Sequence, residues 1–389
     1  MRESELDLAI VGGGVMGLYA AVHLLELGAQ GVAVFERDPL YRHASSALSA
    51  GGVRDLLSSE VNIALAVRSL QDFRDFPART ATSQGPGPDI GLRSKGYLFL
   101  TNAANEADFL RRAELQERLG AAVRRLDRGE LARRYPELRA DDLTGAILGP
   151  NCGYLDAYQV LRGLRAKAQD LGALIVEEEV TSIGLLDGRA ALVEGRGSRI
   201  RARRGVVDAA GAWAGEVGAL AGVEVPVRPW VRQLYLCQPP DGALGDYPFV
   251  ADPGGLYFRP EPGGRILVGK ALPDDPWAFC WDWQRERFLE RIWPDLAARV
   301  PALERLRLES GWAGVVEQTP DGSGLIGEHP DLAGFHLLAG FSGLGIMLAP
   351  AAGRALAEIV LGRSPTVDVA ALSPGRFAAG RQVEEERTI

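Results

Sequence analysis

Lysine is scarce in this chain of 389 residues, and basic side chains are fewer than acidic ones. Lys and Arg together number 43 against 51 Asp and Glu, so the formal net charge is −8 at pH 7. The lysines are Lys95, Lys167 and Lys270, and arginine supplies the rest. Because no basic stripe stands out, we do not expect nucleic acid as a partner.

Cysteine is also scarce, and its pattern argues against a disulfide framework or a zinc site. The three cysteines are odd in number and widely separated: Cys152, Cys237 and Cys280. Such usage fits a reducing compartment. The N-terminus up to Asp7 is acidic and polar, unlike a secretory signal. We therefore expect a cytoplasmic protein.

Long uninterrupted apolar runs are missing. Leu8–Val22 is too short to cross a bilayer, which needs ~20 apolar residues. The run Leu337–Gly353 is interrupted by glycines and by Pro350. Both patterns favour buried strand–turn–helix units, so we expect no integral membrane segment. The histidines show no metal-ligand spacing, and no metal site is predicted: His23, His43, His329 and His336.

What the N-terminus does contain is the pattern of a βαβ unit. Leu6–Val11 is a short apolar run typical of a buried parallel strand. The glycine-rich motif of residues 12–17 follows, and then Leu18–Leu27 has helical periodicity. Val32–Phe35 predicts the second strand, which leads into Glu36. This arrangement is typical of dinucleotide binding.

Each part of this unit has a physical role. Gly12 permits a tight turn, Gly14 lets the backbone approach a pyrophosphate, and Gly17 lets the helix pack closely on the strand. The helix N-terminus offers unpaired N–H groups to phosphate oxygens. Glu36 can accept hydrogen bonds from ribose hydroxyls. The unit alone does not distinguish FAD from NAD.

Two later segments have the same character. In Val206–Ala214 a short apolar run ends in small residues, which admit a ligand at the carboxyl edge of a sheet. Phe335–Ala339 predicts another strand, and the loop that begins at Gly340 then starts a helix to Leu361. The N–H groups at the start of that helix can face an anion or a developing negative charge.

Together with two further segments, these motifs resemble a known family. The further segments are ASSALSAGGVR (44–54) and GYLDAYQVLRGLRAKAQDLGA (153–173), with VVDAAGAWA (206–214) and GFSGLGIM (340–347) after them. The ordered set is similar to the D-amino acid oxidase superfamily of FAD enzymes, and most similar to its sarcosine oxidase, glycine oxidase and amino acid dehydrogenase branch. The resemblance extends from Leu6 to about Gly362.

The resemblance implies FAD as the cofactor and assigns residues to it. They are Gly12, Gly14, Val15, Met16, Gly17, Glu36, Arg37, Ser45, Ser46, Gly51, Gly52, Val180, Gly211, Trp213, Gly340, Gly343, Leu344, Gly345, Ile346 and Met347. In the family, the helix that begins near Gly345 points at the flavin pyrimidine, and backbone groups at the position of Val180 bind adenine.

The resemblance also implies an α/β fold: a Rossmann-like FAD-binding domain of the glutathione-reductase type and a second α+β substrate domain on a mixed or antiparallel sheet. The FAD-binding domain would comprise 1–85, 151–220 and 311–364, and the substrate domain 86–150 and 221–310. Residues 365–389 would form a C-terminal tail, which is polar from Pro374 onward and expected to be mobile.

Local patterns add elements to this outline. Helices are expected over Glu106–Leu119, Asp156–Leu171 and Trp283–Trp293. Antiparallel strands are expected over Tyr97–Leu100, Gln233–Leu236, Leu256–Phe258 and Ile266–Val268.

The family reaction implies oxidation of an amine or amino acid by hydride transfer to flavin N5, which gives an imine that hydrolyses. An amino acid carries a carboxylate, which arginine binds bidentately. The candidates for that role are Arg54, Arg232 and Arg259, with Tyr257 and Trp312 as pocket residues. The electron acceptor would be oxygen or an electron-transfer partner. Substrate identity, chirality and oligomeric state stay open.

Three positions depart from the sarcosine oxidases. Their substrate-binding lysine is Met347 here, the histidine of the same loop is Leu344, and Gly314 stands where their flavin-linked cysteine lies. We therefore expect non-covalent FAD and an altered carboxylate anchor. Lys270 lies three residues from the position where oxidases keep an oxygen-activating lysine, which leaves oxidase and dehydrogenase both possible.

Two other functions stay open. The same fold could oxidise a hydroxy acid, or the chain could be a non-catalytic FAD-bound subunit or assembly factor. The aromatic cluster of residues 277–283 could serve the second function as a docking patch or a lid, or could simply cover the substrate domain.

Overall fold

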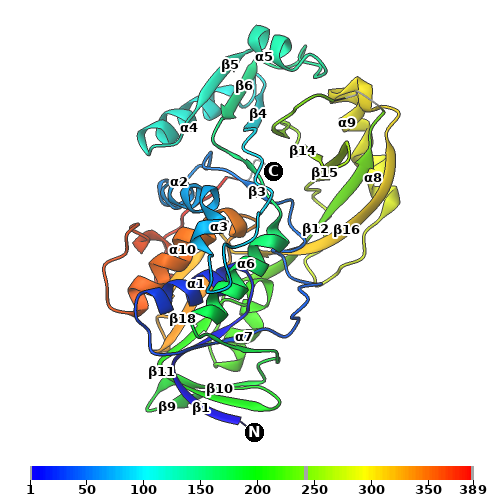
Figure 1. Cartoon of the computed structure of the whole chain (residues 1–389). Coiled ribbons are helices and arrows are strands. Elements are labelled where there is room, and N and C mark those ends of the chain that lie inside the picture. The colour runs from blue at the N-terminus through cyan, green and yellow to red at the C-terminus, as the bar shows by residue number, and fades with distance from the viewer. Residues whose placement is uncertain (1, 241–243, 387–389) are drawn as a thin grey trace.

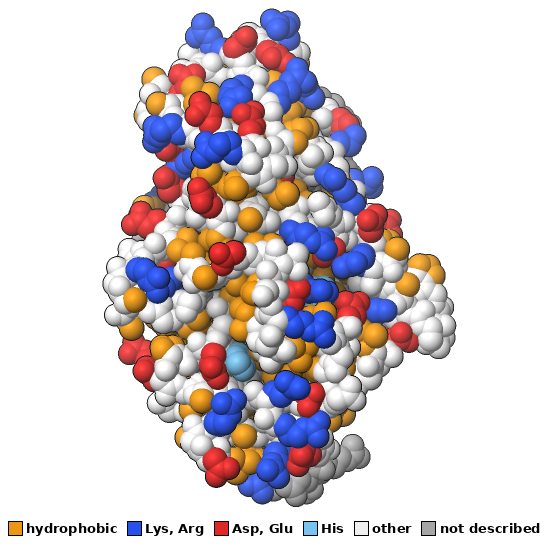
Figure 2. Space-filling view, turned by 90° about the vertical axis from the view of Figure 1, so that its left-hand side faces the viewer, with side chains coloured by type: hydrophobic (Ala, Val, Ile, Leu, Met, Phe, Trp, Pro, Cys, Tyr) orange, Lys and Arg blue, Asp and Glu red, His pale blue; other side chains and the backbone are white. Residues whose placement is uncertain are grey.

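The computed structural model describes residues 2–240 and 244–386. They form two large sheets at opposite ends of an elongated molecule, with helices between and around them (Figure 1). The predicted α/β fold class is confirmed. Figure 2 shows acidic and basic side chains interspersed over one face, without a block of one sign.

The first sheet surrounds the N-terminal strand. Its strand order is β17-β18-β11-β1-β2-β8, and β9 and β10 extend it beside β11. The strands are β1 (Arg2–Val11), β2 (Val32–Phe35), β8 (Leu174–Val176), β9 (Ser182–Leu186), β10 (Arg189–Glu194), β11 (Ser198–Asp208), β17 (Leu325–Glu328) and β18 (Phe335–Ala339). β1 pairs in parallel with both β2 and β11. The ends of β2 and β11, which are about 170 residues apart in the chain, therefore lie at the same sheet edge.

Both faces of β1 are buried, which explains its continuous apolar run. Leu8 and Ile10 face a core shared with helices, whereas Ala9 and Val11 face a second core on the opposite side. The helices are α1 (Val15–Glu26), α2 (Glu60–Arg74), α3 (Phe76–Arg79), α4 (Glu106–Arg118), α5 (Arg128–Arg134), α6 (Ala157–Asp170), α7 (Ala214–Leu220), α8 (Arg285–Arg291), α9 (Trp293–Arg299) and α10 (Gly345–Val360). α1 packs against α6 and α10.

The second sheet has the order β16-β12-β15-β14-β13-β4-β6-β5. Its strands are β4 (Tyr97–Thr101), β5 (Arg124–Asp127), β6 (Gly145–Gly149), β12 (Arg228–Gln238), β13 (Phe249–Ala251), β14 (Leu256–Glu261), β15 (Arg265–Lys270) and β16 (Arg307–Gln318). The pairing is antiparallel except between β4 and β13. A short ladder of β3 (Gly52–Val53) and β7 (Gly153–Tyr154) lies between the two sheets.

The helix expected over Trp283–Trp293 is wrong in its bounds. Gln284 has extended backbone angles, so α8 begins at Arg285. It ends before Ile292, and α9 then starts a separate turn with Pro294, which needs no N–H partner in a first turn. A pattern of apolar residues cannot reveal this break, because both helices direct apolar side chains to the same core.

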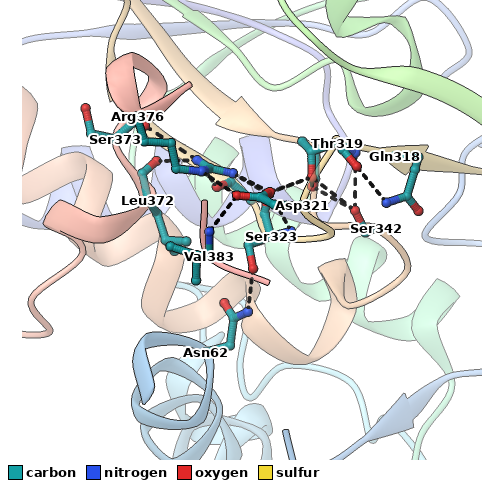
Figure 3. A network of polar contacts seen from close by, with 12 residues as sticks. Asn62, Gln318, Thr319, Asp321, Ser323, Ser342, Leu372, Ser373, Arg376 and Val383 are labelled. Carbon is teal, nitrogen blue, oxygen red and sulfur yellow. Dashed lines mark hydrogen bonds and ion pairs between the residues drawn. The ribbon is translucent and has the colours of Figure 1, made fainter. Parts of the chain in front are cut away.

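The expectation of a mobile tail is wrong for residues 374–386. The Arg376 side chain is 1% exposed and makes two hydrogen bonds of 2.8 Å with the Asp321 carboxylate (Figure 3). Glu385 accepts hydrogen bonds from the backbone of Ser58 and from Asn62 of α2. The tail therefore packs into the protein next to the start of α2.

Candidate active site

A cavity of about 970 Å³ lies between the two sheets. Its walls come from chain segments that are distant in sequence. We use "cofactor wall" for the lining residues of the segments 11–16, 42–52, 209–217 and 342–347, and "aromatic wall" for Tyr97, Trp230, Phe249 and Tyr257.

The cofactor wall begins with the turn after β1. Gly12 has φ +105°, and a Cβ there would overlap the backbone oxygen of Ala209. Gly14 precedes the first turn of α1 and leaves open space, since a Cβ would first meet Ser46 Oγ at 3.6 Å. The backbone N–H of Val15 donates to the same Ser46 Oγ at 3.4 Å. The turn thus lines the cavity with backbone and leaves room beside Gly14, at the N-terminus of α1, where a phosphate can bind.

Glu36 directly follows β2 and lines the cavity. It accepts hydrogen bonds from the backbone N–H groups of Gly13 at 2.9 Å and Asp38 at 2.8 Å. Burial raises the pKa of Glu36, although the two backbone donors act against this. Arg37 pairs with Glu179 at 3.0 Å, and its guanidinium lies 4.3 Å from the Trp213 ring centroid. These contacts hold the Glu36 carboxylate and the Trp213 ring in place at the cavity.

The cofactor wall continues through two loops. Ser45 donates from Oγ to the backbone oxygen of Val315 at 2.5 Å, so the 44–52 loop is held against β16. The loop before α10 turns through Gly340 and Gly343, with φ of +80° and +89°. Ser342 N–H donates to the backbone oxygen of Glu317 at 2.9 Å. α10 therefore begins at the cavity.

Most of the predicted FAD residues lie at this cavity. The cavity is lined by Gly12, Gly14, Val15, Met16, Glu36, Arg37, Ser45, Ser46, Gly51, Gly52, Val180, Gly211, Trp213, Gly343, Leu344, Gly345, Ile346 and Met347. Gly17 and Gly340 are not lining residues. A Cβ at Gly17 would overlap the backbone oxygen of Gly12, and one at Gly340 would overlap the Thr319 side chain, so both glycines allow close packing behind the wall.

The three candidate arginines differ in their partners. Arg54 lines the cavity and is 5% exposed; its Nη1 donates to the Leu56 backbone oxygen at 2.7 Å. Within residues 2–240 and 244–386, no carboxylate pairs with Arg54. Arg259 instead pairs with Glu261 at 2.7 Å and is not a lining residue, and Arg232 lines the cavity but pairs with Asp275 at 3.1 Å.

The aromatic wall stands beside Arg54. The rings of Tyr97 and Phe249 stack with centroids 4.1 Å apart, and Tyr257 stacks on Phe249 at 5.7 Å. The Arg54 guanidinium lies 5.4 Å from the Tyr97 ring centroid. Burial raises the pKa of Tyr257 to about 12, so its hydroxyl is neutral at ordinary pH. This end of the cavity combines an apolar surface with one buried cation.

Other predicted residues lie elsewhere. Trp312 is not a lining residue, and its Nε1 donates to the Leu48 backbone oxygen at 2.9 Å. Lys270 pairs with Asp295 at 2.5 Å, also outside the cavity lining. Of the aromatic cluster, Trp281 lines the cavity, while Trp277 is 47% exposed and stacks on Trp230 at 4.8 Å.

Sequence reasoning missed several residues of the site. Glu317 lines the cavity near the end of β16, and Asp208 ends β11 with its side chain fully buried. Glu317 stands two residues before Thr319-Pro320-Asp321, and the alternation along its strand gave no reason to single it out. Phe249 was missed because β13 is only three residues long.

A glycine-rich turn on a parallel sheet, an acidic residue directly after its second strand and a cavity of about 970 Å³ are together typical of a dinucleotide-binding site. The family model described as FAD dependent oxidoreductase (DAO) matches residues 7–359. The chain belongs to this family of FAD-dependent oxidoreductases. The resemblance noted from the sequence is thus confirmed, and so is FAD as the cofactor.

Individual relatives cover nearly the whole chain. The Bos taurus protein "FAD-dependent oxidoreductase domain-containing protein 1" is 34% identical over 420 residues, which are 97% of this chain and 86% of that protein. A glycine oxidase of Geobacillus kaustophilus is 31% identical over 384 residues, with 97% and 99% coverage. The crystal structure of L-proline dehydrogenase from P. horikoshii superposes with a TM-score of 0.88 at 25% identity, covering 98% of this chain and 100% of that one.

The residues present fit FAD. The open space beside Gly14 and the turn at Gly12 form a cradle that a side chain would fill, and Glu36 offers a fixed carboxylate. In the described part of the chain, no helix is long and apolar enough to cross a membrane.

Proposed function

We propose that the protein oxidises the C–N bond of an amino acid, with Arg54 binding the carboxylate of the substrate. The observation that carries this proposal is the buried guanidinium of Arg54 at the cavity, without a carboxylate partner among the described residues. A buried cation is expensive to maintain unless an anion pairs with it. An anionic group of the substrate can provide that pairing.

The chemistry of the site fits this role. When bound, FAD supplies the redox chemistry by accepting a hydride from the substrate. The chain supplies binding and a dry surface: Arg54 fixes the carboxylate, and Tyr257 and Phe249 present apolar faces to the rest of the substrate. Loss of a hydride from carbon and a proton from nitrogen gives an imine, which water hydrolyses. A neutral bound amine needs no strong side-chain base.

The names of the relatives support an amine as the donor, because glycine oxidase and L-proline dehydrogenase are both named for amino acids. The departure at Met347 is consistent with Arg54 as the anchor. Met347 lines the cavity at the start of α10 and carries no charge there. The cation is instead supplied by the segment that follows β3. The cytoplasmic location expected from the cysteines remains a prediction.

The test is anaerobic bleaching of the bound flavin by D- and L-amino acids, N-methyl amino acids and 2-hydroxy acids. We expect bleaching by amino acids with one carboxylate and an apolar substituent. Bleaching only by hydroxy acids would establish the alternative oxidation, and no bleaching by any compound would favour the non-catalytic subunit. Re-oxidation of the bleached protein in air, or its failure, distinguishes oxygen from an electron-transfer partner as acceptor.

Two variants test the anchor. Arg54→Met removes the charge and should lower kcat/KM for the amino acid by about 100-fold, the scale of a lost buried charge pair. The matched variant Arg259→Met removes a buried arginine that already has Glu261 as its partner. Arg259→Met should leave the Michaelis constant for the amino acid nearly unchanged once the amount of folded protein is corrected for. An equal rise of the Michaelis constant in both variants would contradict the assignment of Arg54 as the carboxylate anchor.

We also propose that FAD is bound without a covalent link. Gly314 lines the cavity where a linking cysteine would stand, and Cys152, Cys237 and Cys280 are not among the lining residues. Acid precipitation should release all yellow colour into the supernatant. Flavin that stays in the pellet would contradict this proposal.

A further inference from the structure

Two buried carboxyl side chains stand where the two sheets meet at the cofactor wall. Glu317 belongs to β16 of the second sheet and is 8% exposed, and Asp208 ends β11 of the first sheet and is 0% exposed. Neither forms an ion pair within residues 2–240 and 244–386. Asp208 Oδ1 accepts the N–H of Ala210 at 3.0 Å, whereas Oδ2 has no hydrogen-bond partner among the described residues.

Glu317 contacts both loops of the cofactor wall. Its Oε2 accepts the backbone N–H of Gly340 at 3.0 Å, and its backbone oxygen accepts the N–H of Ser342 at 2.9 Å. A Cβ placed on Gly211 would lie 3.5 Å from Oε2, and one placed on Gly345 would lie 3.6 Å from Oε1. The carboxyl group therefore lies between the turn after β11 and the start of α10, and the residue lines the cavity.

The surroundings of Glu317 contain little charge. The loops of residues 209–213 and 340–345 carry no ionisable side chain, and the residue opposite on β12 is Pro229. Glu317 acts on Asp208, whose pKa is raised well above the ordinary value by burial and also by the charge of Glu317. Burial raises the pKa of Glu317 to about 7, although the N–H groups of Gly340 and Phe341 act against this. Two adjacent buried acids cannot both ionise cheaply.

We propose that Glu317 holds an exchangeable proton in the wall of the FAD site and takes up or releases it as the charge in the cavity changes, while its side chain positions the loop of residues 340–345. Negative charge that develops in the cavity increases the proton affinity of Glu317. Glu317 then binds one proton from solvent and becomes neutral, which offsets one unit of that charge. This inference rests on the FAD site and not on the substrate proposed above.

The experiment follows the visible absorption spectrum of the FAD-loaded protein as the pH is raised through neutrality, without any substrate. We expect a one-proton transition with a midpoint at about pH 7. Glu317→Gln keeps an oxygen that can accept the Gly340 N–H but cannot ionise, so this variant should bind FAD and lose the transition. Asp208→Asn is the matched control, because it removes the other buried acid and should retain the transition.

A second measurement uses the reduction potential of the bound flavin. Above neutral pH, reduction of the wild-type flavin should take up one more proton than reduction of the flavin in Glu317→Gln. The reduction potential of the wild-type protein should therefore fall more steeply with pH. A transition that persists in Glu317→Gln, or that is lost only in Asp208→Asn, would overturn the proposal. So would a wild-type spectrum that does not change across neutrality. Since no amine is present, a wrong substrate assignment would leave these outcomes unaffected.

Discussion

The two walls of the cavity are built in different ways. The cofactor wall presents backbone: Gly12, Gly14 and Gly343 line the cavity at the edge of a parallel sheet. The aromatic wall presents side chains, since Tyr97, Phe249 and Tyr257 stand on three strands of the other sheet. At Gly12 the backbone of the cofactor wall leaves no room for added atoms, whereas a wall of side chains can bind a different ligand when one residue is substituted. We therefore expect substitutions in the cofactor wall to affect FAD binding, and substitutions in the aromatic wall to affect the substrate.

The largest effect is expected from adding atoms to the cofactor wall. Gly12→Val should abolish FAD binding, because its φ of +105° disfavours a β-branched side chain and its Cβ would overlap Ala209. The measurement is the flavin absorbance that copurifies with the protein. Gly28→Ala is the control: it has φ +98° but open space around it, so it should cost about 1–2 kcal/mol and keep the flavin. Loss of flavin in both variants would show that strain alone is responsible.

The next effect tests the support behind the cofactor wall. Arg376→Met should lower the free energy of unfolding by about 3–5 kcal/mol, because it leaves the buried Asp321 carboxylate without its cation. Urea unfolding measures this. Burial acts to raise the pKa of Asp321, but Arg376 and the Val383 N–H hold it below its ordinary value. The pair therefore contributes stability above about pH 4, which is lost as the pH falls through the lowered pKa. A wild-type stability independent of acid pH would contradict the pairing.

A smaller effect is expected at the aromatic wall. Tyr257→Ala should lower kcat/KM for an apolar amino acid by about 10- to 100-fold, the scale of removing one buried aromatic contact. The bound FAD spectrum should not change, because Tyr257 belongs to the other sheet. Tyr257→Phe keeps the ring and should retain most of the activity. If Tyr257→Ala loses FAD, the two walls are not independent.

The smallest effect is expected at Glu36. Glu36→Gln should weaken FAD binding by about 10-fold, since the amide nitrogen would face one of the two N–H donors of Gly13 and Asp38. Titration of the apoprotein with FAD measures the dissociation constant. Glu179→Gln changes an exposed carboxylate at the same cavity and should alter the constant by less than about 2-fold. Equal losses would point to the overall charge of the cavity.

The sequence predicted the cofactor wall far better than the aromatic wall, and the reason is physical. The turn, helix and strand of residues 6–36 follow one another in the chain, so their spacing alone predicts the cradle. The aromatic wall depends on the parallel pairing of β4 with β13, two strands about 150 residues apart. No local pattern in the sequence predicts a pairing between strands so far apart in the chain.

The choice among the arginines was partly accessible from the sequence. Arg259 and Glu261 are two residues apart on one strand, so their side chains lie on the same face and can pair. That spacing could have removed Arg259 from the candidates. The burial of Glu317 and of Arg376 could not be foreseen, because a charged residue in a strand or in a polar tail usually faces solvent.

The packing of the C-terminal tail has a consequence for the order in which the FAD site is assembled during synthesis. β1 is made long before the loop that precedes α10. That loop is held through Thr319 and Ser342, and the neighbouring Asp321 is held by Arg376 (Figure 3). Chains grow from the N-terminus, so the turn at Gly12 is made well before the loop of residues 340–345 that completes the cavity. We therefore expect FAD to bind only after residue 376 has been made, so a nascent chain halted before that residue should be colourless.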